Sequence, residues 1–303
     1  MKHFLNLIDL STDNLTHLIS QSARLKSAHA QRIPAHSLAG RSVGLIFEKP
    51  SLRTRVSFES GIAQLGGTSI YLPGNEVGLG WRESLADFSR TVSSYIDALV
   101  LRVYRHKTLV DLCQNSTIPI INALSDWSHP CQALADLLTI RELFGCEKGR
   151  TVAFIGVGYN VAISLAVGCG KLGIRFILAC PVGYGFDKTF KADYCTKVSP
   201  DFPTEVNDPK EAIVEADIIY TDVWTSMGQE AEREERLKRF TPFQVNAALL
   251  AIAPSHCKVL HCLPAHRGEE VTDDVLDGPA SAAFQQAANR LHTQKAVLEW
   301  LMT

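Results

Sequence analysis

The sequence predicts an α/β fold of two domains, each a parallel sheet flanked by helices, with a C-terminal helix packing back on the first domain. Three observations support this prediction. Short β-branched or aliphatic runs alternate with helical patterns, the alternation recurs in both halves, and 303 residues suit two cores of roughly 150 residues. Ligands of open parallel sheets bind beyond the carboxyl ends of the strands, so chemistry is expected in the loops that follow them.

The first half of the chain carries four predicted strands with helices between them. The strands are expected at Val43–Glu48, Ser69–Leu72, Ala98–Arg102 and Ile118–Ile121. The helices are expected at Arg55–Leu65, Glu83–Tyr95 and Cys131–Leu143. Each strand is a short apolar run, which is typical of strands buried in a parallel sheet.

The second half repeats this rhythm. Its strands are expected at Thr151–Ile155, Phe176–Ala179, Asp217–Tyr220 and Lys258–Leu260, and Asn160–Leu172 is the clearest helix between them. A polar, glycine-containing break at residues 144–150 separates the halves. We therefore expect a first domain at residues 1–144, a second at 145–281, and a last helix, Ala282–Leu301, within 282–303.

Composition and charge disfavour several classes of protein. Thirty basic and 32 acidic side chains nearly cancel, whereas a nucleic-acid-binding protein more often carries a basic excess. No apolar run reaches the ~18 residues that a membrane helix needs, and no signal peptide is visible at the start, so a cytoplasmic protein is expected. The eight cysteines form no C-x-x-C pair, so neither a zinc site nor a disulfide framework is expected.

The loop after the first predicted strand has the makings of an anion site. Pro50 forces a turn there and a helix begins near Ser51, so free backbone N–H groups are expected at the helix start. Ser51 and Thr54 add hydroxyl donors, and Arg53 adds a guanidinium fork that suits phosphate. On spacing alone, a capped helix with solvated arginines is an equally good interpretation.

Two further strand ends in this half carry polar side chains. Arg102 closes one strand, and His129 and Gln132 lie at the start of the helix after the next. A lone arginine is usually a surface charge and a lone histidine usually a satisfied core or cap residue, but three such loops at one sheet edge favour an anion site. Arg53 and Arg102 would neutralise a phosphate, His129 would donate to a carbonyl oxygen, and Gln132 would recognise an amide.

The second half carries a glycine turn and two polar strand ends. The turn at 156–160 matches a dinucleotide fingerprint poorly, because the third glycine would fall at Val161 and no acid ends the next strand. Asp222 follows one strand, where an acid can hold an amino group. His261-Cys262-Leu263-Pro264 follows the last strand and can present backbone carbonyls and a thiol.

These residues carry a family resemblance that spans nearly the whole chain in the family's order and spacing. The motifs that resemble the carbamoyl-phosphate-binding motifs of the aspartate and ornithine carbamoyltransferase superfamily are Ser51-Leu52-Arg53-Thr54-Arg55, Arg102, His129-Pro130-Cys131-Gln132 and Asn289-Arg290-Leu291-His292. Those that resemble its ornithine branch are the segments 222–228 and 261–264. Each motif alone is weak, and together they are highly specific.

The resemblance implies a role for each motif residue. The phosphate would be held by Ser51, Arg53, Thr54 and the backbone at Leu52. The carbamoyl carbonyl would be polarised by Arg102 and His129. The carbamoyl amide would be placed by Gln132, Arg290 and the backbone of Cys262 and Leu263. Ornithine would be bound by Asn160, Asp222, Ser226 and Met227.

The resemblance also implies how the protein works as a whole. The first domain would bind carbamoyl phosphate, the second would bind ornithine, and the last helix would return to the first domain. The family is typically a homotrimer with active sites shared between subunits, and its direct transfer needs no cofactor or metal. Cys262 would therefore orient or contact the amine, although a covalent nucleophile and an inert core thiol are the alternatives.

Departures from the family's pattern keep other interpretations open. Leu52 replaces a threonine of the phosphate loop, Tyr159 replaces an asparagine, and Gly78 stands where relatives often have glutamine or histidine. Other acceptors, namely aspartate, an N-acylated ornithine or a diamine, are therefore alternatives. A non-catalytic trimer partner and a nicotinamide-dependent oxidoreductase come from different classes, and the set Arg53, Arg102, His129 and Gln132 argues against the former.

Overall fold

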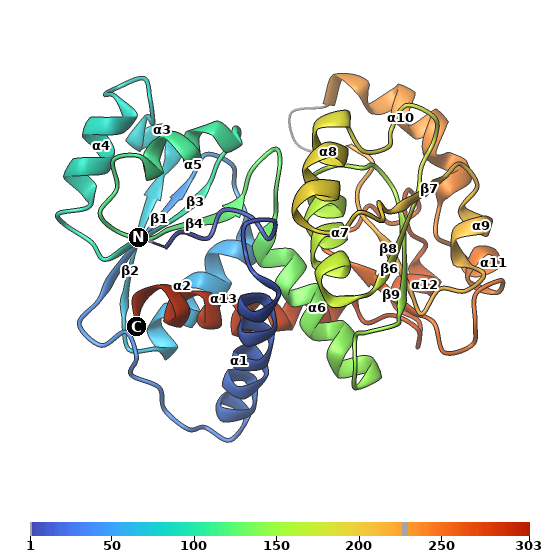
Figure 1. Ribbon diagram of the computed structural model, residues 1–303, viewed down its shortest axis with the longest axis horizontal. Helices are drawn as coiled ribbons and strands as arrows, with labels where there is room; N and C mark the ends of the chain where they lie inside the picture. The colour runs from blue at the N-terminus through green and yellow to red at the C-terminus, as the bar shows by residue number, and fades with distance from the viewer. Residues whose placement is uncertain (1, 226–229) are drawn as a thin grey trace. The chain divides into compact units, whose positions relative to one another are not determined.

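The structure is a computed structural model that describes residues 2–225 and 230–303. It divides into two compact units (Figure 1). The first unit comprises Met1–Leu138 with Asn289–Thr303, and the second comprises Thr139–Ala288. Each unit is built on one parallel sheet with helices on its faces, and the C-terminal helix contributes to the first unit, which confirms the predicted fold class.

The first unit contains a four-stranded parallel sheet in the order β2-β1-β3-β4. Its strands are β1 (Ser42–Phe47), β2 (Thr68–Pro73), β3 (Ala98–Arg102) and β4 (Ile120–Leu124). Its helices are α1 (Thr12–Ala30), α2 (Leu52–Gln64), α3 (Gly74–Val77), α4 (Leu85–Val92) and α5 (His106–Cys113), together with parts of α6 (Pro130–Phe144) and α13 (Ala283–Met302). Residues of β1, β3 and β4 are almost all buried, as their apolar sequences predict.

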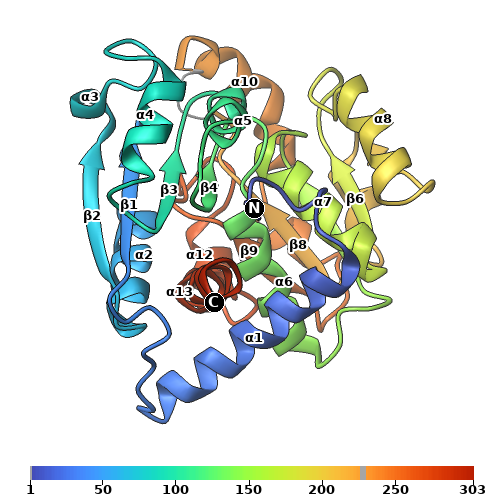
Figure 2. The ribbon, with the colours of Figure 1, turned by 60° about the vertical axis from the view of Figure 1, so that its left-hand side comes forward.

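Right-handed crossovers place these helices on both faces of the sheet. The chain moves outward from β1 to β2 through α2 and then crosses back to β3 through α3 and α4, so α2 lies on one face and α4 on the other. Helix α13 packs beside α2, where Lys295 and Leu291 lie against Gly61 (Figure 2). The carboxyl ends of β1, β3 and β4 thus meet at one edge of the sheet, with the start of α2 above it.

The second unit contains a five-stranded parallel sheet in the order β7-β6-β5-β8-β9. Its strands are β5 (Thr151–Ile155), β6 (Arg175–Ala179), β7 (Thr204–Val206), β8 (Ile218–Thr221) and β9 (Lys258–His261). Its longer helices are α7 (Asn160–Leu172), α8 (Lys188–Lys197) and α10 (Arg233–Phe240), and its shorter ones are α9 (Pro209–Ile213), α11 (Ala247–Leu250), α12 (Asp273–Leu276), η1 (Glu230–Glu232) and η2 (Thr241–Phe243). The same crossover rule places α7 and α8 on one face and α9 to α11 on the other.

Passing segments of the chain pair with the outer edges of two strands. Near the N-terminus, Phe4 forms a parallel bridge with β4. Before α13, the backbone of Ala280 and Ala282 hydrogen-bonds to Val259 of β9 at 2.8 Å in both directions. These pairings satisfy backbone groups that an edge strand would otherwise offer to solvent.

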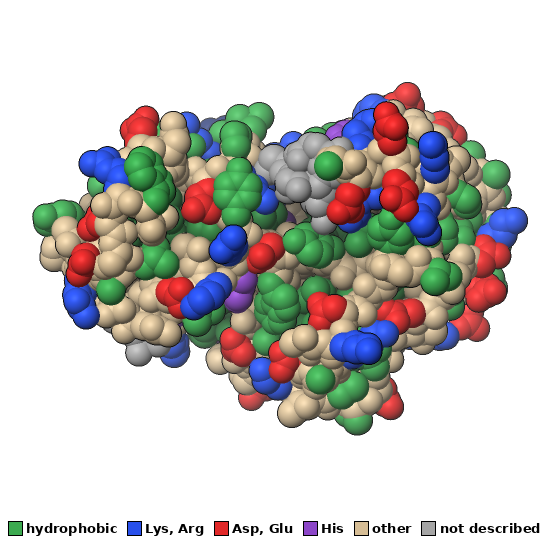
Figure 3. Space-filling model, turned by 90° about the horizontal axis from the view of Figure 1, so that it is seen from above, with side chains coloured by type: hydrophobic (Ala, Val, Ile, Leu, Met, Phe, Trp, Pro, Cys, Tyr) green, Lys and Arg blue, Asp and Glu red, His purple; other side chains and the backbone are tan. Residues whose placement is uncertain are grey.

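The surface of the protein mixes charges of both signs, and its cysteines are free. On the face shown in Figure 3, basic and acidic side chains are interspersed. Among the described helices, none is long and apolar enough to cross a membrane. The eight cysteines are free thiols, of which Cys146 and Cys195 are exposed.

Candidate active site

The phosphate loop lies between β1 and α2 in the first unit. Ser51 occupies the N-cap position of α2 with extended backbone, and its side chain makes no capping bond to the helix. Instead its hydroxyl donates to Thr54 Oγ1 at 2.9 Å, which brings both hydroxyls into the first turn beside Arg53. The Leu52 side chain is 76% exposed, so this residue can contribute to an anion site only through its backbone.

A buried arginine ties this loop to the start of α6. Arg290 of α13 donates from Nη1 to Gln132 Oε1 and from Nη2 to Thr54 Oγ1, both at 2.9 Å. Gln132 in turn donates from Nε2 to Asp136 Oδ1 at 2.8 Å. Since a buried guanidinium is costly unless its N–H groups are hydrogen-bonded, this network holds α2, α6 and α13 in a defined arrangement.

His129 lies among cationic groups in the same unit. Its side chain is buried, and burial, then the Arg290 and Arg102 guanidinium groups, hold the pKa of its imidazole well below the usual range. The ring is therefore neutral at physiological pH, and one ring nitrogen can donate to a carbonyl oxygen without adding a buried charge. Arg102 ends β3, where its backbone oxygen accepts from Glu48 N at 2.9 Å.

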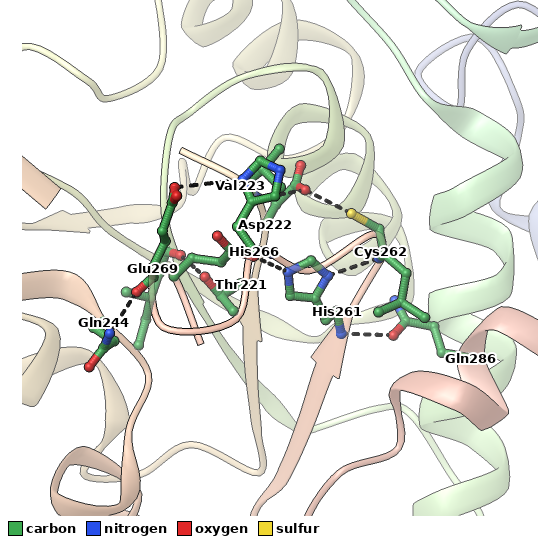
Figure 4. Close-up of polar contacts among 12 residues, drawn as sticks. Thr221, Asp222, Val223, Gln244, His261, Cys262, His266, Glu269 and Gln286 are labelled. Carbon is green, nitrogen blue, oxygen red and sulfur yellow. Dashed lines mark hydrogen bonds and ion pairs between the residues drawn. The ribbon is translucent and has the colours of Figure 1, made fainter. Parts of the chain in front are cut away.

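The second unit presents an acid and a thiol at neighbouring strand ends. β8 and β9 are paired in parallel with Thr221 opposite His261, so the residues that follow, Asp222 and Cys262, leave the sheet at the same edge. The Cys262 thiol donates to Asp222 Oδ1 at 2.9 Å, and Val223 N donates to the same oxygen at 2.8 Å (Figure 4). Each residue is predicted by its own motif, whereas the hydrogen bond between them is not.

The environment of Asp222 has opposing effects on its charge. Burial raises the pKa of its carboxyl group, while the His261 ring, the Cys262 thiol and the Val223 N–H lower it and the Glu270 carboxylate raises it. The net effect is a raised pKa. A half-buried carboxylate of this kind is stabilised by an ammonium ligand, because the positive charge favours the ionised form.

Next to Cys262, a buried histidine and a buried glutamate form hydrogen bonds that hold the end of β9. His261 Nδ1 accepts from Leu263 N at 2.8 Å, so its proton is on Nε2, which lies 3.0 Å from Glu270 Oε1 (Figure 4). Both side chains are fully buried. Sequence reasoning missed Glu270, because its only signal is an acid nine residues after His261. Leu263 has a φ of 54°, a left-handed conformation that is uncommon for leucine.

Asn160 lies at the carboxyl end of β5, beside β8. It is buried at the start of α7, and its Oδ1 accepts from Val161 N at 2.9 Å. Because β5 neighbours β8 in the sheet, Asn160 and Asp222 belong to the same edge of the second unit. Two other predicted ornithine-binding residues, Ser226 and Met227, lie outside the described residues.

One set of potential metal ligands occurs among the described residues of the chain. Ligand atoms of His266, Glu269 and Glu270 lie within 4.8 Å of one another. However, Glu269 is ion-paired with Arg233 and Glu270 with His261. These partners already engage one oxygen of each carboxylate.

Comparison with known proteins matches both halves of the chain to one family. Residues 2–142 match the model described as aspartate/ornithine carbamoyltransferase, carbamoyl-P binding domain, and residues 148–301 match the corresponding Asp/Orn binding domain. A relative from Bacillus subtilis (strain 168), ornithine carbamoyltransferase, is 48% identical over 99% of this chain and 94% of its own length. An anabolic ornithine carbamoyltransferase from Pyrococcus furiosus is 47% identical over 99% and 96%.

Solved structures agree with these matches. The structure of ornithine carbamoyltransferase from Pyrococcus furiosus superposes with a TM-score of 0.96 at 46% identity, covering 99% of this chain and 97% of that one. The anabolic enzyme from Campylobacter jejuni gives a TM-score of 0.92 at 34% identity over 99% of both chains. The chain therefore belongs to the aspartate/ornithine carbamoyltransferase family, and within it to the ornithine carbamoyltransferases.

Proposed function

We propose how the residues of this chain divide the work of the family's reaction. The enzyme transfers the carbamoyl group of carbamoyl phosphate to the δ-amine of L-ornithine, giving L-citrulline and phosphate. The first unit binds carbamoyl phosphate and the second binds ornithine. The observation that carries this assignment is the buried Arg290 guanidinium, which links the hydroxyl of Thr54 to the amide of Gln132.

The groups of the first unit match carbamoyl phosphate part by part. Ser51, Thr54, Arg53 and the Leu52 backbone hold the phosphate at the start of α2. The neutral ring of His129, together with the guanidinium of Arg102, binds the carbonyl oxygen. Gln132 and Arg290 recognise the carbamoyl amide, because Gln132 Oε1 can accept a second hydrogen bond besides that from Arg290.

The second unit supplies an anionic site that suits an amino acid with two amines. Asp222 holds the α-amino group. Asn160, Ser226 and Met227 contact the remaining backbone groups of ornithine. Cys262 contacts the attacking amine, and the Cys262 and Leu263 backbone carbonyls place the carbamoyl amide. These assignments rest on the motifs of the ornithine branch and on the Asp222–Cys262 hydrogen bond.

Catalysis follows from proximity and charge. The neutral δ-amine attacks the carbamoyl carbon, and the carbonyl oxygen gains negative charge. The C–O bond to phosphate then breaks, and the departing phosphate takes the proton that the amine loses. Arg102 and His129 stabilise this oxyanion, and preorganised donors lower a barrier more than donors that must reorient. Phosphate is already a good leaving group, so proximity supplies much of the rest.

We also propose the wider setting that the sequence predicts. The functional halves are residues 1–144 and 145–281, with 282–303 returning to the first. The enzyme acts as a cytoplasmic homotrimer, or a multiple of trimers, with shared active sites. Size-exclusion chromatography with light scattering tests the trimer, since a monomer of full activity would contradict it.

Ornithine is expected to be the preferred acceptor. Asp222 supplies a carboxylate for a free α-amino group, which an N-acylated ornithine lacks, and a diamine offers no carboxylate to the remaining donors. The measurement is kcat/KM with carbamoyl phosphate against ornithine, N-acetylornithine, putrescine and aspartate. A higher kcat/KM for any of the other three amines would overturn the acceptor assignment.

Replacing Cys262 with serine is expected to weaken ornithine binding but to leave measurable turnover. The serine hydroxyl can still donate to Asp222, and direct transfer consumes no thiol. The rate at low ornithine should rise from about pH 6 to 8.5 in both proteins, because only the neutral amine attacks. His129 does not cause this rise, since its lowered pKa leaves it neutral throughout.

The control is Cys195→Ser, which removes an exposed thiol of the same unit. This variant should match the wild type in KM for ornithine and in pH profile. A folded Cys262→Ser protein without activity, together with a carbamoyl thioester trapped on the wild type, would replace direct transfer by a covalent mechanism.

A further inference from the structure

Gln286 is a fully buried side chain whose amide is used at both ends. It lies in the first turns of α13, within the second unit, and it belongs to no motif that the sequence analysis singled out. Its Oε1 accepts from His261 N at 2.9 Å, and its Nε2 donates to Tyr220 Oη at 3.0 Å. Figure 4 shows the first of these bonds reaching the last residue of β9.

The bond to His261 completes the outer edge of β9. In a strand, alternate N–H groups point to the same side. The N–H of Val259 is satisfied by the backbone of Ala280, and the next N–H on that side, from His261, receives Gln286 Oε1 instead. The Gln286 side chain therefore takes the role of an adjacent backbone segment at the end of β9, directly before Cys262.

Three hydrogen bonds now fix His261. Gln286 holds its backbone N–H, Glu270 holds Nε2, and Nδ1 accepts from the N–H of Leu263. Cys262 lies between His261 and Leu263, and its thiol reaches Asp222 Oδ1 at 2.9 Å. The placement of this thiol therefore depends on where His261 is held at the end of β9.

The other end of Gln286 links the same point to β8. Tyr220 is the residue two before Asp222, it is fully buried, and it pairs with Leu260 across the sheet. One amide therefore connects the strand that precedes Asp222 with the strand that precedes Cys262. A neutral amide does this without placing another charge near Asp222 and Glu270.

We propose that Gln286 is a positioning residue for the amine-binding site, holding the ends of β8 and β9 so that Cys262 and Asp222 keep their separation. This inference rests on the proposed function of the second unit as the ornithine site. Gln286 acts through His261 and Tyr220 and does not itself contact the substrate.

The decisive variant is Gln286→Met, which keeps the length of the side chain and removes both hydrogen bonds. Displacing a substrate contact by a fraction of an ångström is costly, so kcat/KM for ornithine should fall about 10- to 100-fold. The loss should be smaller for carbamoyl phosphate, whose phosphate and carbonyl oxygen are held by residues of the first unit and which meets the second unit only at the Cys262 and Leu263 backbone. Gln285→Met is the matched control, since Gln285 is the preceding residue and its Nε2 donates to Glu142 of α6 at 2.8 Å rather than to β8 or β9.

A pH profile separates positioning from a merely structural role. The groups that face Asp222 are the Cys262 thiol, the His261 ring and the Glu270 carboxylate, and the thiol bond favours the ionised carboxyl. If Gln286→Met loosens that bond, the pKa of Asp222 rises, and the acidic limb of kcat/KM for ornithine moves to higher pH. A variant that is only less stable would show a lower melting temperature with this limb unmoved.

Tyr220→Phe supplies the milder variant. It removes only the bond that Gln286 donates to Tyr220 and leaves the bond from His261 N to Gln286 Oε1, so ornithine kcat/KM should stay nearer the wild type than in Gln286→Met. It also tests the inference if Gln286→Met does not fold, since a smaller loss in the same direction is expected.

Three results would overturn the inference. They are equal ornithine kinetics in Gln286→Met and Gln285→Met, an equal loss for both substrates with an unchanged acidic limb of the pH profile, or a folded Tyr220→Phe protein with wild-type ornithine kinetics. These failures differ from failure of the proposed function. If the wild type preferred another amine, the ornithine assignment itself would be wrong. If the wild type used ornithine and Gln286→Met had normal kinetics, only the positioning role would be wrong.

Discussion

Replacing Arg102 with alanine is expected to lower kcat/KM for carbamoyl phosphate by about 100-fold or more, because a preorganised cation at a developing oxyanion contributes that much to a rate. Arg102 ends β3, and its guanidinium is one of the groups that lower the pKa of His129. Steady-state kinetics and a melting curve measure the effect. We expect a melting temperature close to that of the wild type, since the side chain stands at a strand end rather than in the core.

Arg41→Ala is the matched control for this prediction. Arg41 is an exposed arginine of the same unit, paired with Asp97 at 2.7 Å, and surface pairs of this kind contribute about 0–1 kcal/mol. It should leave turnover unchanged. Near-normal turnover in a folded Arg102→Ala protein would remove Arg102 from the mechanism.

Replacing Asp222 with asparagine is expected to lower kcat/KM for ornithine by about 100-fold, with little change in the KM for carbamoyl phosphate. The change removes the charge and keeps the shape, because an asparagine Oδ1 can accept the same bonds from Cys262 and Val223 that Asp222 accepts. Initial rates against ornithine at fixed carbamoyl phosphate measure the loss.

The pH dependence of the Asp222 variant has a defined sign. Because the pKa of Asp222 is raised, its carboxylate is protonated at a higher pH than an ordinary aspartate as the pH falls. Wild-type kcat/KM for ornithine should fall with it at the acidic end. Asp222→Asn should lose this contribution and keep only the rise that reports deprotonation of the amine. Asp277→Asn, an exposed aspartate of the same unit paired with Arg267, is the control. A normal ornithine KM in Asp222→Asn would exclude the charge contact.

The elements that sequence predicted well are those with a strong buried pattern. Ala98–Arg102, Thr151–Ile155 and Asn160–Leu172 have the predicted bounds in the structure, because each is an apolar run bounded by polar residues or glycine. β7 was missed because its three residues are mostly exposed and carry no apolar pattern. The α8 helix was missed because its sequence is polar and shows little periodicity.

The residues of the candidate site also fall into those predicted from local motifs and those missed because they depend on tertiary contacts. Local motifs at strand ends were sufficient to select Asp222 and Cys262, but their hydrogen bond depends on the register that pairs Thr221 with His261, and the two residues are 40 apart in sequence. Glu270 and Gln286 were missed because they lie 9 and 25 residues from His261 and act through it. Contacts of this kind arise from tertiary packing, which no spacing rule within a single segment can show.

The chain segments that pair with the edge strands β4 and β9 affect the tendency of the protein to aggregate at high concentration. An edge strand with open N–H and C=O groups is a template on which a strand of another molecule can add, and such addition is a route to fibres. Phe4 occupies this position on β4, residues 280–282 and the Gln286 amide occupy it on β9, and β7 is only three residues long. Removal of the first few residues would uncover the edge of β4, so an N-terminal truncation would favour aggregation through a strand that the intact chain keeps paired.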